Sequence, residues 1–217
     1  YLMFLTLSVY QKLSKQVAFI IFNVKQADLL HIDEEGEELE EEDYKLYELL
    51  GLDCKHFENV TYLLPQGEPD KPDSDSPPED YELYAYSLAD VYARFDLLFA
   101  DVPDPYFTLD TFNSRIRDDW EHGQVSIRAP GQPPRFVRNW DDLKRVDNDL
   151  LAKAYNLHPV TPPRIKRELT RLTASPLFVN NRTADQIYLG ERVKKIKPGE
   201  IFVVDIARIH TRTQPFI

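Results

Sequence analysis

The sequence predicts an α/β fold built on a parallel β-sheet, with a helical insertion. Two almost uninterrupted apolar runs carry this prediction, at 17–24 (VAFIIFNV) and 201–204 (IFVV). Parallel strands are covered on both faces, so they lack the alternation of polar and apolar residues found in half-exposed strands. A third observation is the apolar helical spacing of 1–15, because a helix followed by a buried strand is the second half of a strand-helix-strand unit. We therefore expect the chain to begin within such a unit.

The remaining elements of the first half follow from periodicity and from glycine and proline positions. We expect helices at 1–15, 42–52 (closed by Gly51) and 88–100, and strands at 59–64 (ended by Pro65) and 81–87. The acidic run 33–43 is interpreted as a solvated loop or helix start, with a partner-binding surface as the alternative. The segment 66–80, rich in Pro, Asp and Ser, is expected to be a mobile loop.

From residue 103 onward the pattern changes to helices separated by prolines. We expect helices at 108–120, 139–157 and 162–175, the last with Thr161 as its N-cap, and an irregular loop or hairpin at 123–137. The second apolar run follows the turn at Pro198 and Gly199. The predicted organisation is therefore an α/β part at 1–102, a helical insertion at 103–180, and a return to the α/β core at 181–217.

Composition limits the classes of protein that this chain can belong to. The 217 residues are 42% hydrophobic, enough for a substantial core, and contain one cysteine, so no internal disulfide can form. No apolar run approaches the roughly 20 residues of a membrane span, and 1–10 lacks the basic leader and cleavage site of a signal peptide. We expect a cytoplasmic protein without a membrane partner.

The formal charge of −11 is unevenly distributed along the chain. Residues 1–105 carry 24 acidic and 7 basic side chains, whereas 106–217 carry 13 acidic and 19 basic. A locally basic half leaves room for contact with a phosphate backbone, although charge alone does not decide it.

Polar groups follow both apolar runs. Asn23, Lys25 and Asp28 follow the first, and Asp205 follows the second. In open parallel sheets, ligands bind outside the carboxyl ends of the strands. We expect Phe22 and Val204 to lie in one parallel sheet, so that these groups face the same cleft, where an α/β protein would meet an anionic ligand. The alternative is structural: Asn23 and Asp28 cap backbone N–H groups of a turn, and Asp205 caps a helix starting near Ala207.

The stretches IIFNVKQADLL and KPGEIFVVDIARIHTRTQPFI resemble the ATPase domain of HerA-like bacterial ATPases, relatives of FtsK-type DNA translocases. This resemblance covers both ends of the chain, about a third of it. It implies a partial RecA-like P-loop NTPase core, in which a phosphate-binding loop precedes the first helix and Asn23, Lys25, Asp28 and Asp205 are candidates to lie near the nucleotide. It also implies ATP and Mg²⁺ as cofactors of the full-length parent protein, hydrolysis coupled to DNA translocation or helicase activity, and a homo-oligomeric ring that has DNA and a nuclease or other protein as partners.

The chain departs from that family in two motifs. None of its seven glycines is followed by Lys, so G-x-x-x-x-G-K-[ST] is absent, and no apolar strand ends in an Asp-Glu pair. The 217 residues are therefore expected to be an interior fragment that binds no cofactor tightly and does not hydrolyse ATP alone, although the parent is an ATPase. No catalytic residue is assigned. The alternative function is a non-catalytic α/β protein-interaction module.

Two groups of basic residues are further candidates. Arg208 and Arg212 are spaced to contact a neighbouring subunit or its phosphates, as a trans-acting arginine does. Arg164, Lys166, Arg167 and Arg171 are candidates for DNA contact. The alternative for both groups is an ordinary solvated surface. Cys54 and His56 lack the further ligands of a zinc site, so no metal site is predicted.

Overall fold

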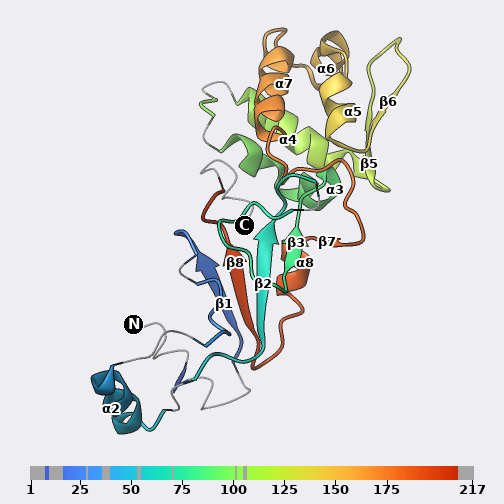
Figure 1. The fold of residues 1–217 in the computed structure, drawn as a ribbon. Coiled ribbons are helices and arrows are strands. Elements are labelled where there is room, and N and C mark those ends of the chain that lie inside the picture. Colours follow the sequence, from blue (N-terminus) through green and yellow to red (C-terminus); the bar gives the residue numbers. More distant parts are fainter. Residues whose placement is uncertain are drawn as a thin grey trace. The chain divides into compact units, whose positions relative to one another are not determined.

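The computed structural model describes residues 8–9, 17–27, 29–35, 40–52, 55–69, 71–100, 102–104 and 107–209. The fold is α/β, with a five-stranded parallel sheet in the order β1-β8-β2-β3-β7 and a small antiparallel sheet in the order β4-β5-β6 (Figure 1). The chain divides into two compact units. The sheet unit comprises the described residues within 1–65, 72–83 and 189–208, and the helical unit comprises those within 66–71, 84–188 and 209–217.

The sheet unit is organised around three parallel strands, β1 (Phe19–Asn23), β8 (Ile201–Asp205) and β2 (Val60–Pro65). Phe22 lies directly opposite Val204, which in turn lies opposite Leu63 on the other side. The prediction that the two apolar runs pair in one parallel sheet is therefore confirmed, and their carboxyl ends meet at the same edge.

The two apolar runs differ in burial, which corrects one expectation. All five residues of β8 are buried, because it lies between β1 and β2. In β1 burial alternates, and Ile20 and Phe22 are 40% and 43% exposed. Burial of this strand on both faces was predicted wrongly: Ile20 and Phe22 share a face with their register partners Phe202 and Val204, but that face stays partly exposed at β1, the edge strand of the sheet. An apolar run cannot by itself distinguish an edge strand from a central one.

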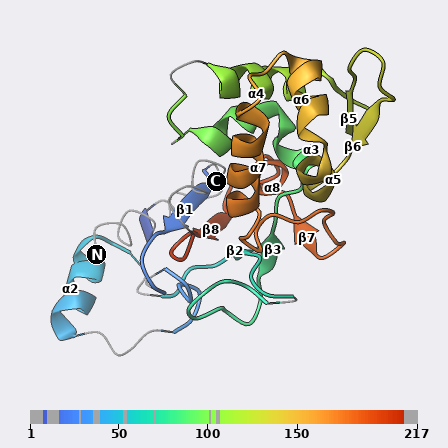
Figure 2. The same ribbon diagram turned by 90° about the horizontal axis from the view of Figure 1, so that it is seen from above.

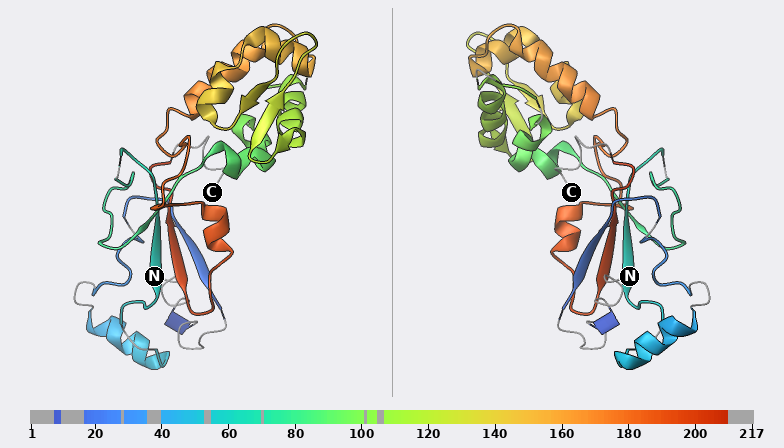
Figure 3. Two further views of the ribbon diagram at one scale, coloured as in Figure 1. Left: turned by 90° about the vertical axis from the view of Figure 1, so that its right-hand side faces the viewer. Right: turned by 90° about the vertical axis from the view of Figure 1, so that its left-hand side faces the viewer.

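One face of these strands carries the core of the sheet unit. Its buried members come from the strands and from two flanking loops: Leu30, Phe57, Tyr62, Leu64, Ile201 and Val203. The short helix α8 (Leu189–Val193) covers the opposite face, as Figure 3 shows. There the Arg192 guanidinium lies 4.3 Å from the centre of the Phe202 ring and pairs with both carboxylate oxygens of Glu82, at 2.7 and 2.8 Å. Arg192 therefore fixes α8 on β8.

The other predicted elements of this unit have the following bounds. Helix α2 runs over Glu41–Leu49 and is followed by Gly51 in the left-handed region (φ 63°), which confirms the predicted stop. Strand β2 ends at Pro65 as predicted, and the expected strand at 81–87 is the shorter β3 (Glu82–Tyr84). The predicted helix 1–15 lies outside the described residues, apart from the helical residues 8–9.

The helical unit begins with a broken helix rather than the continuous one predicted for 88–100. Helix α3 (Leu88–Val91) leads into the 3₁₀ helix η1 (Tyr92–Phe99), and the kink falls at Arg94. The predicted inward face is nevertheless confirmed, since the residues Leu88, Val91, Phe95 and Leu98 are all buried.

Four α-helices and a hairpin complete this unit (Figure 2). The helices are α4 (Thr108–Asp118), α5 (Trp140–Arg145), α6 (Asn148–Tyr155) and α7 (Thr161–Leu172). Strands β4 (Trp120–Glu121), β5 (Gln124–Ile127) and β6 (Arg135–Val137) form the antiparallel sheet, and the short strand β7 is Gln186–Ile187. Of the two alternatives for 123–137, the hairpin is therefore the correct one.

Two helix boundaries differ from the prediction. The helix predicted over 139–157 is interrupted at Val146, because the Asp147 carboxylate accepts hydrogen bonds from the N–H groups of Asp149 and Leu150 and starts α6 anew. Thr161 is the first residue of α7 rather than its N-cap. Val160 occupies the cap position, and no side chain caps this helix.

Several residues of the segment predicted to be a mobile loop, 66–80, make hydrogen bonds. In the sheet unit Asp73 N–H donates to Pro65 O at 2.9 Å, and in the helical unit Gly67 N–H donates to Lys71 O at 2.9 Å.

Among the described residues, no helix combines the length and apolarity that crossing a membrane would require.

Candidate functional site at the sheet edge

The carboxyl ends of β1 and β8 bring together two polar side chains that are distant in sequence. Asn23 and Asp205 are register partners in the parallel pair, and each is only 1% exposed. Asn23 Nδ2 donates to Asp205 Oδ1 at 2.9 Å. Burying a carboxyl group is costly unless hydrogen bonds compensate it, and Asn23 supplies such a bond. The pair lies at the edge where α/β proteins bind ligands.

Both side chains also hold the turns that follow their strands. Asn23 Nδ2 donates to Gln26 O at 2.7 Å, and Asp205 Oδ1 accepts from Ala207 N–H at 3.1 Å. Asp205 thus caps a backbone N–H, as the structural alternative expected, but the described residues 206–209 form a turn and not the expected helix. For Asn23 the capping interpretation needs correction, because the amide donates to a carbonyl instead of accepting from an N–H. Asn23 Oδ1 is buried and has no hydrogen bond within the described part of the chain.

The other residues predicted near this edge are placed differently. Lys25 is exposed and lies in the turn that follows β1. Gln26 in the same turn has a left-handed backbone (φ 47°). Asp28 lies outside the described residues, so the structure says nothing about its predicted role.

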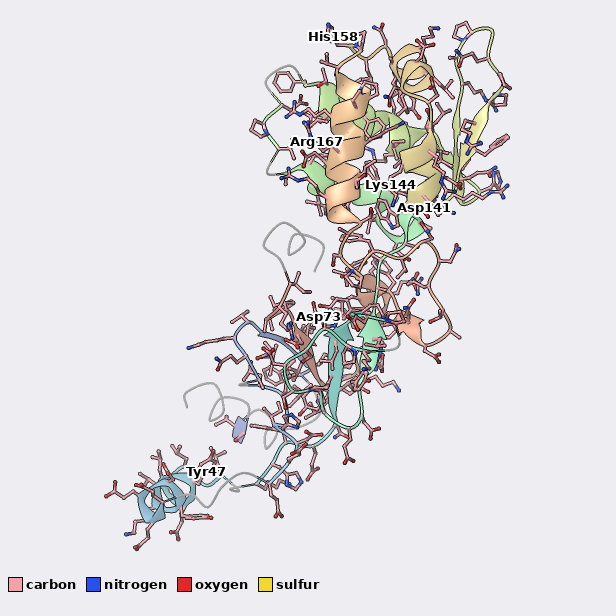
Figure 4. The ribbon with its side chains drawn as sticks, turned by 45° about the horizontal axis from the view of Figure 1, so that its top comes forward. Tyr47, Asp73, Asp141, Lys144, His158 and Arg167 are labelled. Carbon is pink, nitrogen blue, oxygen red and sulfur yellow. The ribbon has the colours of Figure 1, made fainter. Side chains whose placement is uncertain are left out.

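Arg208 follows β8 and is held within its own unit. Its Nε lies 3.0 Å from Asp73 Oδ1, and its Nη1 lies 3.2 Å from Asp75 Oδ1. Figure 4 labels Asp73 in the segment after β2. With its side chain 51% exposed, Arg208 still reaches solvent, but two carboxylates already engage its guanidinium. Arg212, its predicted partner, lies outside the described residues.

The four basic residues of α7 do not form one free basic face. The side chain of Arg164 donates to Pro103 O. Burial lowers the pKa of Lys166, although the charge of Asp147 acts in the opposite direction. Arg171 lies 3.4 Å from Glu168, and Arg167, labelled in Figure 4, lies 3.8 Å from the same carboxylate. The helical periodicity placed these residues correctly on α7. It gave no indication of the carbonyl and carboxylate groups that their side chains contact.

The residues at the sheet edge fit only part of a magnesium nucleotide site. A carboxylate and an amide oxygen are ligand types that Mg²⁺ uses, often through water. Asp205 and Asn23 supply these oxygens, and the unpartnered Asn23 Oδ1 is the observation that favours such a role. The chain has no phosphate-binding lysine in a glycine-rich loop.

Comparisons with known proteins identify no family for this chain, so a function can be proposed only from the residues described above. No protein-family model matches the chain, and no relative is found among curated proteins.

Sequence reasoning missed the partners of Arg208. Asp73 and Asp75 stand in a segment whose composition predicts a mobile loop, and nothing in the local sequence connects them to a residue more than 130 positions away. The only available indication was that 66–80 follows a strand of the same sheet, and therefore starts at the same edge as the residues after β8.

Proposed function

We propose that this chain is the interior part of a HerA/FtsK-like, ATP-binding DNA translocase or helicase-type ATPase. The observation that carries the proposal is the buried hydrogen bond between Asn23 and Asp205 at the carboxyl ends of two adjacent parallel strands. The proposal also draws on the resemblance of these two strands and their flanking residues to that ATPase family.

In this proposal the fragment supplies sheet strands and edge groups, and the phosphate-binding loop belongs to the full-length protein. The bound ATP and Mg²⁺ supply the phosphoryl group and the charge neutralisation that hydrolysis requires. Asp205 places a carboxyl group at the site edge, and Asn23 orients that group through Nδ2. The full-length protein acts on DNA as a ring of identical subunits in the cytoplasm, alone or with a nuclease or other protein partner.

The proposal is tested by the substitution Asp205→Asn in the full-length protein. We expect at least a tenfold loss of magnesium-dependent ATP turnover, because a loss of about 1.4 kcal/mol in transition-state stabilisation is a factor of ten. Glu200→Gln is the matched control. Glu200 precedes the other end of β8 and accepts from Lys197 N–H at 2.7 Å, so this change perturbs a turn of the same strand away from the proposed site. Turnover of the control should equal that of the unmodified protein, and thermal unfolding should show both variants folded.

Unchanged turnover in Asp205→Asn would contradict the assigned role of the sheet edge. The wider proposal fails if the codons that precede Tyr1 in the gene do not encode G-x-x-x-x-G-K-[ST]. In that case the alternative, a non-catalytic α/β interaction module, takes its place.

A further inference from the structure

The hairpin formed by β5 and β6 carries a basic and aromatic surface that the preceding assignments do not use. Residues 122–140 contain three arginines and a histidine but no acidic residue, in a chain whose formal charge is −11. Figure 1 shows β5 and β6 at the margin of the helical unit. This unit is less acidic than the whole protein, because 84–188 contain 14 acidic and 14 basic residues.

The two faces of the hairpin differ sharply. Val125, Ile127 and Val137 point to one face and are fully buried in the core of the unit. Ser126 and Phe136, which are register partners, point to the other face, since successive strand residues alternate between faces. Phe136 is 45% exposed there. A large aromatic ring therefore lies on the outer face of the β5–β6 hairpin.

Two arginines flank this ring on the same face, and each is held by its Nε atom. Arg138 donates from Nε to Gln124 Oε1 at 2.9 Å, and Arg128 donates from Nε to Ser126 Oγ at 3.1 Å. Within the described part of the chain, neither guanidinium makes a further hydrogen bond or ion pair. The terminal nitrogens, which form the planar fork that matches a phosphate, are thus oriented in advance.

Carboxylates near this surface leave the two guanidinium forks unoccupied. Glu121, in β4, lies opposite Gln124 at one end of the sheet. Asp142 accepts from the backbone N–H of Arg138 at 3.1 Å rather than from its side chain. The third arginine of the segment, Arg135, pairs in register with Ile127 and is exposed at the start of β6.

We propose that the outer face of the hairpin binds single-stranded nucleic acid, with Phe136 stacking on a base and Arg128 and Arg138 contacting phosphates. Stacking on an exposed ring next to basic groups is how proteins bind single strands without sequence preference. An acidic protein segment would satisfy the arginines but leave the ring unused, and a paired duplex offers no open base face. This inference deepens the proposed function by assigning the contact with nucleic acid to the hairpin instead of α7.

The test measures fluorescence anisotropy of a labelled twelve-residue oligo(dT) with the complete chain, without nucleotide. We expect Phe136→Ala to weaken binding by about fivefold or more, because base–aromatic stacking is lost, and Phe136→Trp to preserve it. Arg128→Gln and Arg138→Gln should each reduce the slope of log affinity against log salt by about 0.7, the value for one phosphate contact on a single strand. The matched controls, which should bind like the unmodified chain, are Tyr44→Ala, an exposed aromatic of α2, and Arg94→Gln, an exposed arginine of η1.

Three results would overturn the inference. The first is no detectable binding by the unmodified chain at 50 mM salt, and the second is equal binding by Phe136→Ala. The third is equally effective competition by poly-glutamate or duplex DNA, which would identify a general polyanion surface. Because no ATP is present, failure here leaves the proposal for the sheet edge standing. Failure of Asp205→Asn to affect turnover likewise leaves the hairpin proposal standing.

Discussion

His31 connects two segments of the sheet unit that are separated by more than forty residues. Its Nδ1 lies 2.7 Å from Glu34 Oε1, and its Nε2 lies 3.1 Å from the backbone oxygen of Ser76. The hydrogen bond with the Glu34 carboxylate raises the pKa of His31, and this effect outweighs the opposing effect of burial. Since the folded state favours the protonated ring, protonation and folding stabilise each other.

We expect the free energy of unfolding to fall as pH rises through this raised pKa. Below the ordinary value of 6.5 the ring is protonated in both states, so the full contribution is present, and above the raised pKa it is lost. The difference should be at most about 1 kcal/mol, because both partners are partly exposed. Urea unfolding between pH 5 and 9 measures it.

Two substitutions identify the source of this pH dependence: His31→Asn is the test and His158→Asn is its control. His31→Asn should abolish the pH-dependent step, and asparagine tolerates the left-handed backbone at this position (φ 75°). His158→Asn changes an exposed histidine of the other unit and should preserve the step. A step of equal size in both variants would exclude His31 as its source.

At the scale of the element, sequence periodicity predicted which segments are helical better than where they end. The pattern over 139–157 is consistent with a single helix, because its apolar spacing continues through Val146. The structure instead has two helices, since Asn139 and Asp147 each supply a side-chain cap, to α5 and α6 respectively. Asp is compatible with a helix interior and with a cap, and only the direction taken by the following helix decides between them.

Removing the second cap should destabilise the helical unit. We expect Asp147→Ala to reduce the free energy of unfolding by about 1 kcal/mol, the typical cost of losing an N-cap hydrogen bond. Glu40→Ala is the matched control, because Glu40 occupies the N-cap position of α2 without making a side-chain cap bond. Denaturant unfolding with near-ultraviolet circular dichroism measures both. An equal effect of the two substitutions would show that charge, and not the cap, is responsible.

At the scale of the whole molecule, the chain crosses repeatedly between two compact units, at 65–66, 71–72, 83–84, 188–189 and 208–209. Each unit has its own buried apolar residues, such as Leu64 in the sheet unit and Leu169 in the helical unit, which are 0% and 1% exposed. The two predicted boundaries, at 102/103 and 180/181, follow changes in composition. The crossings between the two compact units follow packing instead. Sequence composition does not record which segments pack together.

Two separate cores should give two unfolding transitions in calorimetry. Leu64→Ala and Leu169→Ala each remove a buried side chain, and each should destabilise its own transition by about 2–5 kcal/mol. The other transition should remain unchanged in each variant, so the two substitutions serve as controls for one another. A single transition that both substitutions lower would show instead that the units unfold cooperatively.

The sequence by itself determined that the chain has two apolar strands followed by polar residues, and that a group of helices lies between them in the sequence. It did so because apolar runs, helical spacing and turn residues are local properties of the chain. Only the tertiary structure decided that β1 is an edge strand, that Arg208 meets Asp73 and Asp75, and that Phe136 pairs in register with Ser126 on the hairpin. These features depend on which distant segments become neighbours, and that is set by the free energy of packing the whole chain rather than by any local pattern.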